Sequence, residues 1–145
     1  MIERIVVGTD GSGEAERAVI WAGELAANLD AELLVVHVFE TDPARLPGGY
    51  AVLSEDELRR LREQAQRCLD GDWTACLKDA SARFRTIRIE GNAAGALIDL
   101  AEREEADLLV AGSRGRGGFA ELLLGSVGHQ LVLHAKVPVT IVPSR

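Results

Sequence analysis

The chain alternates five short β-like runs with helical patterns, and this alternation limits the possible folds more than any other feature of the sequence. The expected strands are residues 4–7, 32–39, 85–90, 106–112 and 137–142. The expected helices are residues 13–29, 54–69, 72–82, 93–105 and 126–135. Such alternation predicts an α/β fold with an open parallel five-stranded sheet and helices on both faces. The length of 145 residues predicts a single domain, residues 1–145.

The composition of each run indicates where its strand lies in the sheet. The first, second and fourth runs are continuously apolar, as strands buried on both faces are. The third run alternates, with Thr86, Arg88 and Glu90 on one side, which is typical of a half-exposed edge strand. The fifth run contains Pro138, and proline favours edge strands because it cannot donate a hydrogen bond to the ladder. Since consecutive elements tend to be neighbours, the predicted strand order is 3-2-1-4-5.

Two glycine-rich loops follow the first and fourth strands, between which the predicted strand order reverses. Ligands of open α/β sheets bind outside the carboxyl ends of the strands at such a point. In the second loop, "GSRGRGG", glycines allow close approach of the backbone, and successive N–H groups can line an anion site. Ser126 is expected to cap the last helix, whose first N–H groups would favour a phosphate. Arg114 or Arg116 could pair with that phosphate, or both could be solvated loop residues.

The first loop, "GTDGSG", is a poorer phosphate site than the second. Glu14 and Glu16 fall in the first turn of the helix that follows it, where carboxylates stabilise the helix but repel a phosphate. Asp10 could instead accept a hydrogen bond from an adenine amino group or a ribose hydroxyl. The alternative is that Asp10, like Ser12, serves only to cap the helix.

Composition and motifs argue against several classes of protein. A net charge of −7 disfavours a general nucleic-acid binder. No run approaches about 18 apolar residues and no basic leader is present, so we expect no membrane association and a cytoplasmic location. Cys68 and Cys76 are expected to be reduced thiols. P-loop and nucleophile-elbow motifs are lacking. His129 and His134 are five residues apart, so they do not share a helix face, and no HExxH motif is present, so no metal site built from side chains is expected.

The stretch "GSRGRGGFAELLLGS" carries the spacing Gly112-x2-Gly115-x9-Gly125-Ser126. This spacing resembles the nucleotide-binding signature of the universal stress proteins, in which the last glycine is followed by Ser or Thr. "IVVGTDGS", "LLVVHV", "EEADLLVAGSRGRGG", "LLGSV" and "KVPVTIVP" match the same family in order and placement. The resemblance covers nearly the whole chain and is weakest over residues 41–85.

The resemblance implies a Rossmann-like fold that binds an adenine nucleotide, with the same 3-2-1-4-5 strand order. It implies ATP as the ligand, with Mg²⁺ carried by the phosphates, although the sequence does not separate ATP from ADP or AMP. By motif, one group of residues would line the adenine and ribose: Gly8, Thr9, Asp10 and Val38. A second group would surround the phosphates: Gly112, Arg114, Gly115, Gly125, Ser126 and Val127. The family also implies a homodimer formed by pairing of the last strands.

We therefore expect an ATP-binding, cytoplasmic regulator of stress responses that is not an enzyme. Near the two loops only Asp10 is a plausible catalytic base, and neither loop contains a lysine. Two alternatives stay open. One is a slow ATP hydrolase or another ATP-dependent enzyme of related fold, and the other is a dimeric interaction module without a bound nucleotide.

Overall fold

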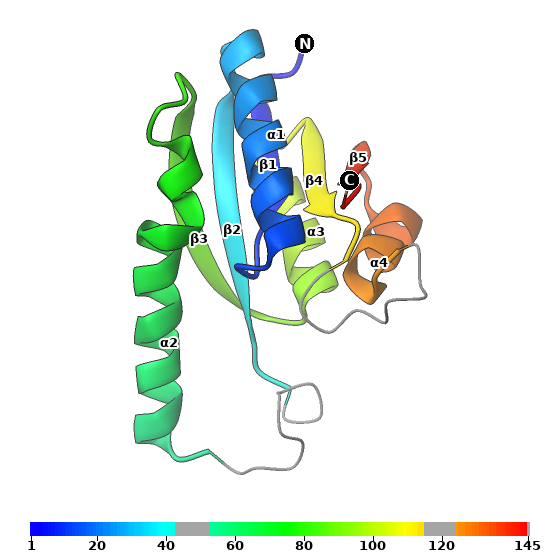
Figure 1. Ribbon diagram of the computed structural model, residues 1–145. Coiled ribbons are helices and arrows are strands. Elements are labelled where there is room, and N and C mark those ends of the chain that lie inside the picture. Colours follow the sequence, from blue (N-terminus) through cyan, green and yellow to red (C-terminus); the bar gives the residue numbers. More distant parts are fainter. Residues whose placement is uncertain (43–52, 115–123, 145) are drawn as a thin grey trace.

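The computed structural model describes residues 1–42, 53–114 and 124–144 and shows one five-stranded sheet between two layers of helices (Figure 1). The strands are β1 (Arg4–Gly8), β2 (Glu32–Glu40), β3 (Arg83–Gly91), β4 (Leu108–Gly112) and β5 (Val139–Val142). The helices are α1 (Gly13–Leu29), α2 (Glu55–Asp70), the 3₁₀ helix η2 (Asp72–Leu77), α3 (Ala93–Arg103) and α4 (Ser126–His134).

The strand order is β3-β2-β1-β4-β5, and every neighbouring pair is parallel. The predicted order and fold class are therefore confirmed. In Figure 1, α1 crosses the front of the sheet while α3 and α4 lie behind it. Consecutive parallel strands need a connection that crosses one face of the sheet, which is why at least one helix lies between each strand and the next.

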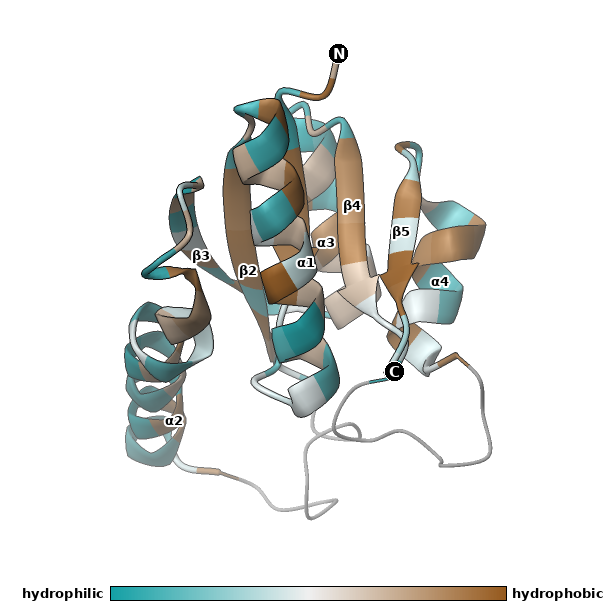
Figure 2. Ribbon diagram, turned by 45° about the horizontal axis from the view of Figure 1, so that its top comes forward, coloured by the Kyte–Doolittle hydropathy of each residue, from teal (hydrophilic) through white to brown (hydrophobic). Residues whose placement is uncertain are grey.

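The three central strands are buried on both faces, as their continuous apolar runs predict. Ile5 and Val7 of β1 contribute to the core beneath α1, α2 and η2, whereas Val6 contributes to the core beneath α3 and α4. All three side chains are completely buried. Each stabilises the fold by about 1.5–3 kcal/mol relative to an exposed side chain. Figure 2 shows β2 and β4 as mainly hydrophobic strands and α2 as a mainly hydrophilic helix.

The polar face of the edge strand β3 is half exposed, as predicted, and α2 packs along it. Three pairs of side chains join the two elements: Arg62 with Glu90, Gln66 with Arg88 at 3.2 Å, and Asp70 with Thr86 at 2.6 Å. Helix residues four apart are separated by about 6 Å, close to the spacing of alternate strand residues. This match allows a mainly hydrophilic helix, of which only Ala65 and Leu69 are buried, to pack on a polar strand.

The segment predicted as a helix over residues 72–82 is shorter and more tightly wound than expected. It forms η2 and ends before β3 begins at Arg83. Within it, the buried Thr74 donates a side-chain hydrogen bond of 2.8 Å to the carbonyl oxygen of Leu69, which ties η2 to the last turn of α2. Gly71 is the C-cap of α2, with φ −120°, and its amide donates to the carbonyl oxygen of Cys68 at 3.2 Å.

Candidate functional site

The two glycine-rich loops leave neighbouring strands at the same edge of the sheet. β1 and β4 pair in parallel with Val7 opposite Val110, so the loops that follow them start side by side. The first residues beyond these two strands, Thr9 and Ser113, are both polar and buried, with 7% and 6% of their surface exposed. Buried polar groups need hydrogen-bond partners, and each of these residues bonds to a neighbouring strand or loop.

The first loop is shaped by hydrogen bonds within residues 9–12, which we call the 9–12 turn. The Thr9 amide donates to the carbonyl oxygen of Val36 at 2.8 Å, and its hydroxyl accepts from the Gly11 amide at 3.2 Å. An Asp10 carboxylate oxygen accepts from the Ser12 amide at 2.9 Å. Ser12, not Asp10, caps α1 by accepting from the Ala15 amide. Asp10 is therefore a turn-forming residue at the carboxyl edge.

The two stems of the second loop are held together by the backbone. The Ser113 amide donates to the carbonyl oxygen of Val142 at 2.9 Å, and the Gly125 amide donates to the carbonyl oxygen of Ser113 at 2.6 Å. The structure thus brings the first and last glycines of the signature, Gly112 and Gly125, to one place. Gly115, predicted to line the phosphates, lies outside the described residues, as does Arg116.

Gly112 has a packing role that the sequence did not reveal. A Cβ on this residue would lie 2.9 Å from the carbonyl oxygen of Glu14, closer than such atoms approach in proteins. The first turn of α1 therefore packs directly on the end of β4. Gly8, the last residue of β1, faces Leu97 of α3 on the opposite side of the sheet, and the Leu97 Cδ1 would lie 2.9 Å from an added Cβ. Both glycines allow helices to approach the carboxyl edge closely.

The N-terminus of α4 differs from the prediction by one residue. Ser126 was expected to be the N-cap, but Gly125 occupies that position and Ser126 is the first helical residue. The shift follows from the Gly125–Ser113 hydrogen bond, which fixes the residue before the helix. Among the described residues, no side chain caps this helix, and its first turn contains no acidic residue.

The start of α4 is a better anion site than the start of α1. α1 carries a serine cap and two acidic residues in its first turn, whereas α4 carries neither. The first N–H groups of a helix have no intrahelical acceptor and attract negative charge. A phosphate therefore fits the α4 end, where Ser126 and Val127 present their amides, and does not fit the α1 end.

Two further predicted residues lie around this edge. Val38 is half-buried on the face that packs against α3 and α4, and it lies two residues beyond Val36, the strand partner of Gly8. Arg114 directly follows Ser113, and its guanidinium donates to the Ser144 hydroxyl at 3.2 Å. The structure thus gathers all predicted site residues within its described part at the carboxyl edge of the sheet.

His37 and Trp73 also contact the 9–12 turn. The His37 Nδ1 lies 2.9 Å from the carbonyl oxygen of Thr9, and the His37 ring meets the Trp73 ring edge-to-face with centroids 4.9 Å apart. Trp73 lies in turn against Gly11. No sequence signal could have found these contacts, because they depend on how η2 is placed over β2.

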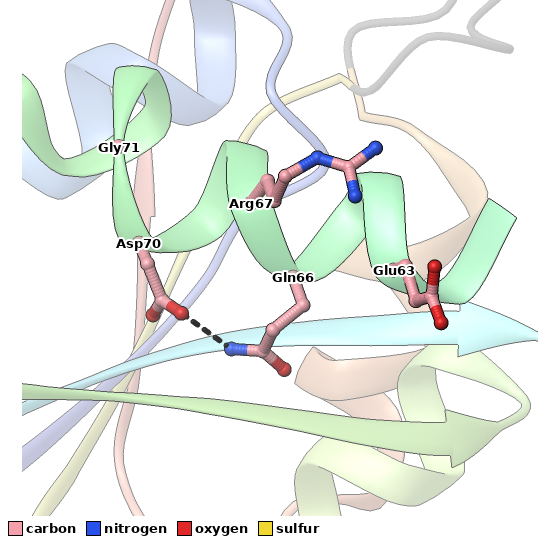
Figure 3. Close-up of a pocket in the computed structure, with 5 residues that line it drawn as sticks. All are labelled: Glu63, Gln66, Arg67, Asp70 and Gly71. Atoms are coloured by element: carbon pink, nitrogen blue, oxygen red, sulfur yellow. Dashed lines mark hydrogen bonds between the residues drawn. The ribbon is translucent and has the colours of Figure 1, made fainter. Parts of the chain in front are cut away.

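A separate hollow of 480 Å³ lies along α2 and is lined by Glu63, Gln66, Arg67, Asp70 and Gly71 (Figure 3). Two of its polar side chains bond to each other: Gln66 donates to Asp70 at 2.9 Å, as the dashed line in Figure 3 marks. Hydrogen bonds from Thr86 and Gln66 lower the pKa of the Asp70 carboxyl. None of the predicted site residues lines this hollow.

Two other kinds of feature are absent from the part of the chain that the structure describes. Residues 1–42, 53–114 and 124–144 contain no group of three or more His, Cys, Asp or Glu side chains that could hold a metal ion. In the same ranges, no helix has the length and apolar character needed to cross a membrane.

Comparison with known proteins gives one consistent result. The model of the universal stress protein family matches residues 1–143. A universal stress protein of Thermus aquaticus is 34% identical over 142 residues, which cover 98% of this chain and 99% of that protein. The crystal structure of a universal stress protein in complex with cAMP is 30% identical, covers 99% of this chain and 98% of its own, and has a TM-score of 0.67. The structure of the hypothetical protein MJ0577 is 26% identical, covers 99% and 96% respectively, and has a TM-score of 0.83.

Proposed function

We propose, from the premise that this chain belongs to the universal stress protein family, that it binds an adenine nucleotide at the carboxyl edge of its sheet, with ATP as the principal ligand. One observation carries the proposal: α4 begins beside the end of β4 without a side-chain cap or an acidic residue in its first turn. Such a helix end provides N–H donors and a favourable field for a phosphate. The similar structure that contains cAMP supports the same class of ligand.

The two loops would bind different parts of the nucleotide. Ser126 and Val127 would donate their backbone amides to the phosphates, because the Gly125 amide already donates to Ser113. The 9–12 turn would face the adenine and ribose, with Asp10 as an acceptor for a hydroxyl or amino group. Val38 would provide an apolar contact to the base. When bound, Mg²⁺ would neutralise part of the phosphate charge and would be held by the nucleotide.

We propose a regulatory role in stress responses rather than catalysis. Hydrolysis needs a positioned base, and the carboxylate of Asp10 is already used to hold the Ser12 amide. The lysines of the chain, Lys78 and Lys136, lie outside both loops, and Lys136 pairs with Glu102. Free thiols at Cys68 and Cys76 agree with a role in the reducing cytoplasm.

We also propose that the protein is a homodimer formed along β5. This strand is an edge of the sheet, and an edge presents unpaired backbone groups to a second chain. The carbonyl oxygens of Pro138 and Val142 accept hydrogen bonds from β4. Because successive strand residues direct their backbone groups to opposite sides, Val139 and Ile141 direct theirs outward. The N–H that Pro138 lacks would face β4, so this proline leaves the outward edge intact.

Isothermal titration calorimetry with ATP, ADP, AMP and cAMP, each with and without Mg²⁺, tests the proposed ligand. We expect saturable binding of at least one of these nucleotides, and the same heat should be absent with inorganic phosphate at equal concentration. Absence of binding by all four at millimolar concentration would contradict nucleotide binding. A parallel assay for phosphate release from ATP distinguishes the regulator from the slow hydrolase.

A further inference from the structure

The indole of Trp73 lies directly on Gly11, at the centre of the 9–12 turn. A Cβ built on Gly11 would lie 2.3 Å from both Cε2 and Nε1 of Trp73, so the ring covers the Cα of this glycine. Gly11 also has φ +78°, a conformation that side-chain-bearing residues rarely adopt. The turn is therefore shaped from outside by an aromatic ring as well as from inside by its own hydrogen bonds.

His37 connects the same indole to the neighbouring residue of the turn. Its ring lies edge-to-face with Trp73, with centroids 4.9 Å apart and planes at 70°. Its Nδ1 lies 2.9 Å from the carbonyl oxygen of Thr9. Trp73 and His37 thus contact adjacent parts of one turn, and both come from elements distant from it in the sequence.

Trp73 is held firmly enough to impose this shape. It packs partly against the core cluster beneath α1, and Leu77 of the same short helix is 2% exposed. Leu77 in turn packs so closely on Gly23 of α1 that a Cβ there would lie 2.5 Å from Leu77 Cδ2. Thr74 ties η2 to α2 through its bond to Leu69. The indole is therefore fixed to the body of the domain before it meets Gly11.

We propose that Trp73 is a positioning residue of the nucleotide site, which acts with His37 to hold the 9–12 turn in the conformation that presents Asp10 to the ligand. This inference rests on the proposed nucleotide binding. A turn that adopts its binding conformation only part of the time binds with an apparent affinity reduced by that fraction. Removal of the indole should therefore weaken binding without removing any group that contacts the phosphates.

Two leucine variants test the role of the indole. Trp73→Leu is expected to raise the Kd about tenfold for ATP and for AMP alike, because the turn serves the adenine and ribose side. Trp73→Phe, which retains an aromatic ring, should recover most of the affinity. Trp21→Leu is the matched control, since Trp21 lies on α1, is 37% exposed and is the other tryptophan of the chain. This variant should bind with the wild-type Kd.

A variant with one tryptophan provides an independent test of whether Trp73 responds to nucleotide binding. In Trp21→Phe, Trp73 is the sole tryptophan, and its emission should change on titration with ATP, with the same Kd that calorimetry gives. Circular dichroism at the assay temperature confirms that each variant is folded. Wild-type affinity in Trp73→Leu, or unchanged Trp73 emission while calorimetry detects binding, overturns the inference and leaves the proposed function standing. Absence of nucleotide binding by the wild-type protein overturns both.

Discussion

The backbone amide of Gly125 donates a hydrogen bond of 2.6 Å to the carbonyl oxygen of Ser113. This bond joins the start of α4 to the end of β4 and consumes the N–H of the last glycine in the signature. The donors that remain for a phosphate are therefore those of the next two residues, Ser126 and Val127. Gly125 thus places the start of α4, and the N–H groups of Ser126 and Val127 are the ones left for the proposed ligand.

This division predicts different results for two substitutions of Ser126. Ser126→Pro removes one helix N–H at the first helical position, where proline is tolerated. Gly125 has φ −69° and ψ 168°, which suits a residue before proline. We expect ATP to bind about tenfold or more weakly to Ser126→Pro, and AMP to be affected less, as measured by calorimetry. A hydrogen bond to a charged group contributes about 1.5–3 kcal/mol.

Ser126→Ala is the matched control for this experiment. It keeps the backbone N–H and removes only the hydroxyl, so its Kd for ATP should stay within about threefold of the wild-type value. If the alanine variant loses as much affinity as the proline variant, the hydroxyl is the ligand-binding group. If neither variant loses affinity, the phosphates do not bind at α4.

Gly112 is expected to be needed for stability independently of any ligand. In Gly112→Ala the added methyl group would meet the carbonyl oxygen of Glu14 at 2.9 Å, so α1 or β4 must shift. Such overpacking costs about 1–3 kcal/mol. The free energy of unfolding of the nucleotide-free protein, measured in urea, should fall by this amount. Loss of nucleotide binding in this variant alone would thus not identify a ligand contact.

Gly13→Ala provides the comparison, because a Cβ on Gly13 meets no atom within 4 Å. Alanine at this first helical position should leave the free energy of unfolding unchanged or raise it by about 0.5 kcal/mol, since it restricts the unfolded chain. Equal destabilisation of the two variants would show that the close approach of Glu14 to Gly112 is not what makes this glycine necessary.

Much of the fold and the location of the candidate site could be predicted from the sequence. The continuous apolar runs and Pro138 gave the strand order, because burial and backbone donors depend on local composition. What could not be predicted depends on distant contacts. The Gly125–Ser113 bond moved the N-cap from Ser126, and the placement of η2 brought Trp73 to Gly11. Likewise, the half-exposed polar face of β3 gave no indication that α2 would pack along it.

Asp107 predicts a specific dependence of stability on pH. One oxygen of its carboxylate accepts hydrogen bonds from the amides of Glu3 at 2.8 Å and Arg4 at 3.1 Å, and these bonds lower its pKa. A lowered pKa in the folded state stabilises the protein above the unfolded pKa of about 3.9, and this contribution is lost as pH falls through the folded pKa.

Asp107→Ala should therefore lower the free energy of unfolding by about 1 kcal/mol at pH 7. In urea titrations at successive pH values, its difference from the wild-type protein should shrink below about pH 4. Asp107→Asn keeps a neutral hydrogen-bond acceptor, so its free energy of unfolding at pH 7 should lie between those of Asp107→Ala and the wild-type protein. A difference between Asp107→Ala and wild type that stays constant from pH 7 to pH 2 would contradict a role for the charged carboxylate.

Two substitutions of Ile141 distinguish a dimer held by backbone pairing along β5 from one held by packing of the Ile141 side chain. Ile141→Pro removes an N–H that points away from β4, whereas Ile141→Ala keeps that N–H and removes most of the same side chain. Since edge strands tolerate proline where the N–H faces outward, both variants should fold. Light scattering should report a dimer for the wild-type protein and Ile141→Ala, and a monomer for Ile141→Pro. A folded Ile141→Pro that remains dimeric would place the interface elsewhere, and a monomeric wild-type protein would exclude the dimer.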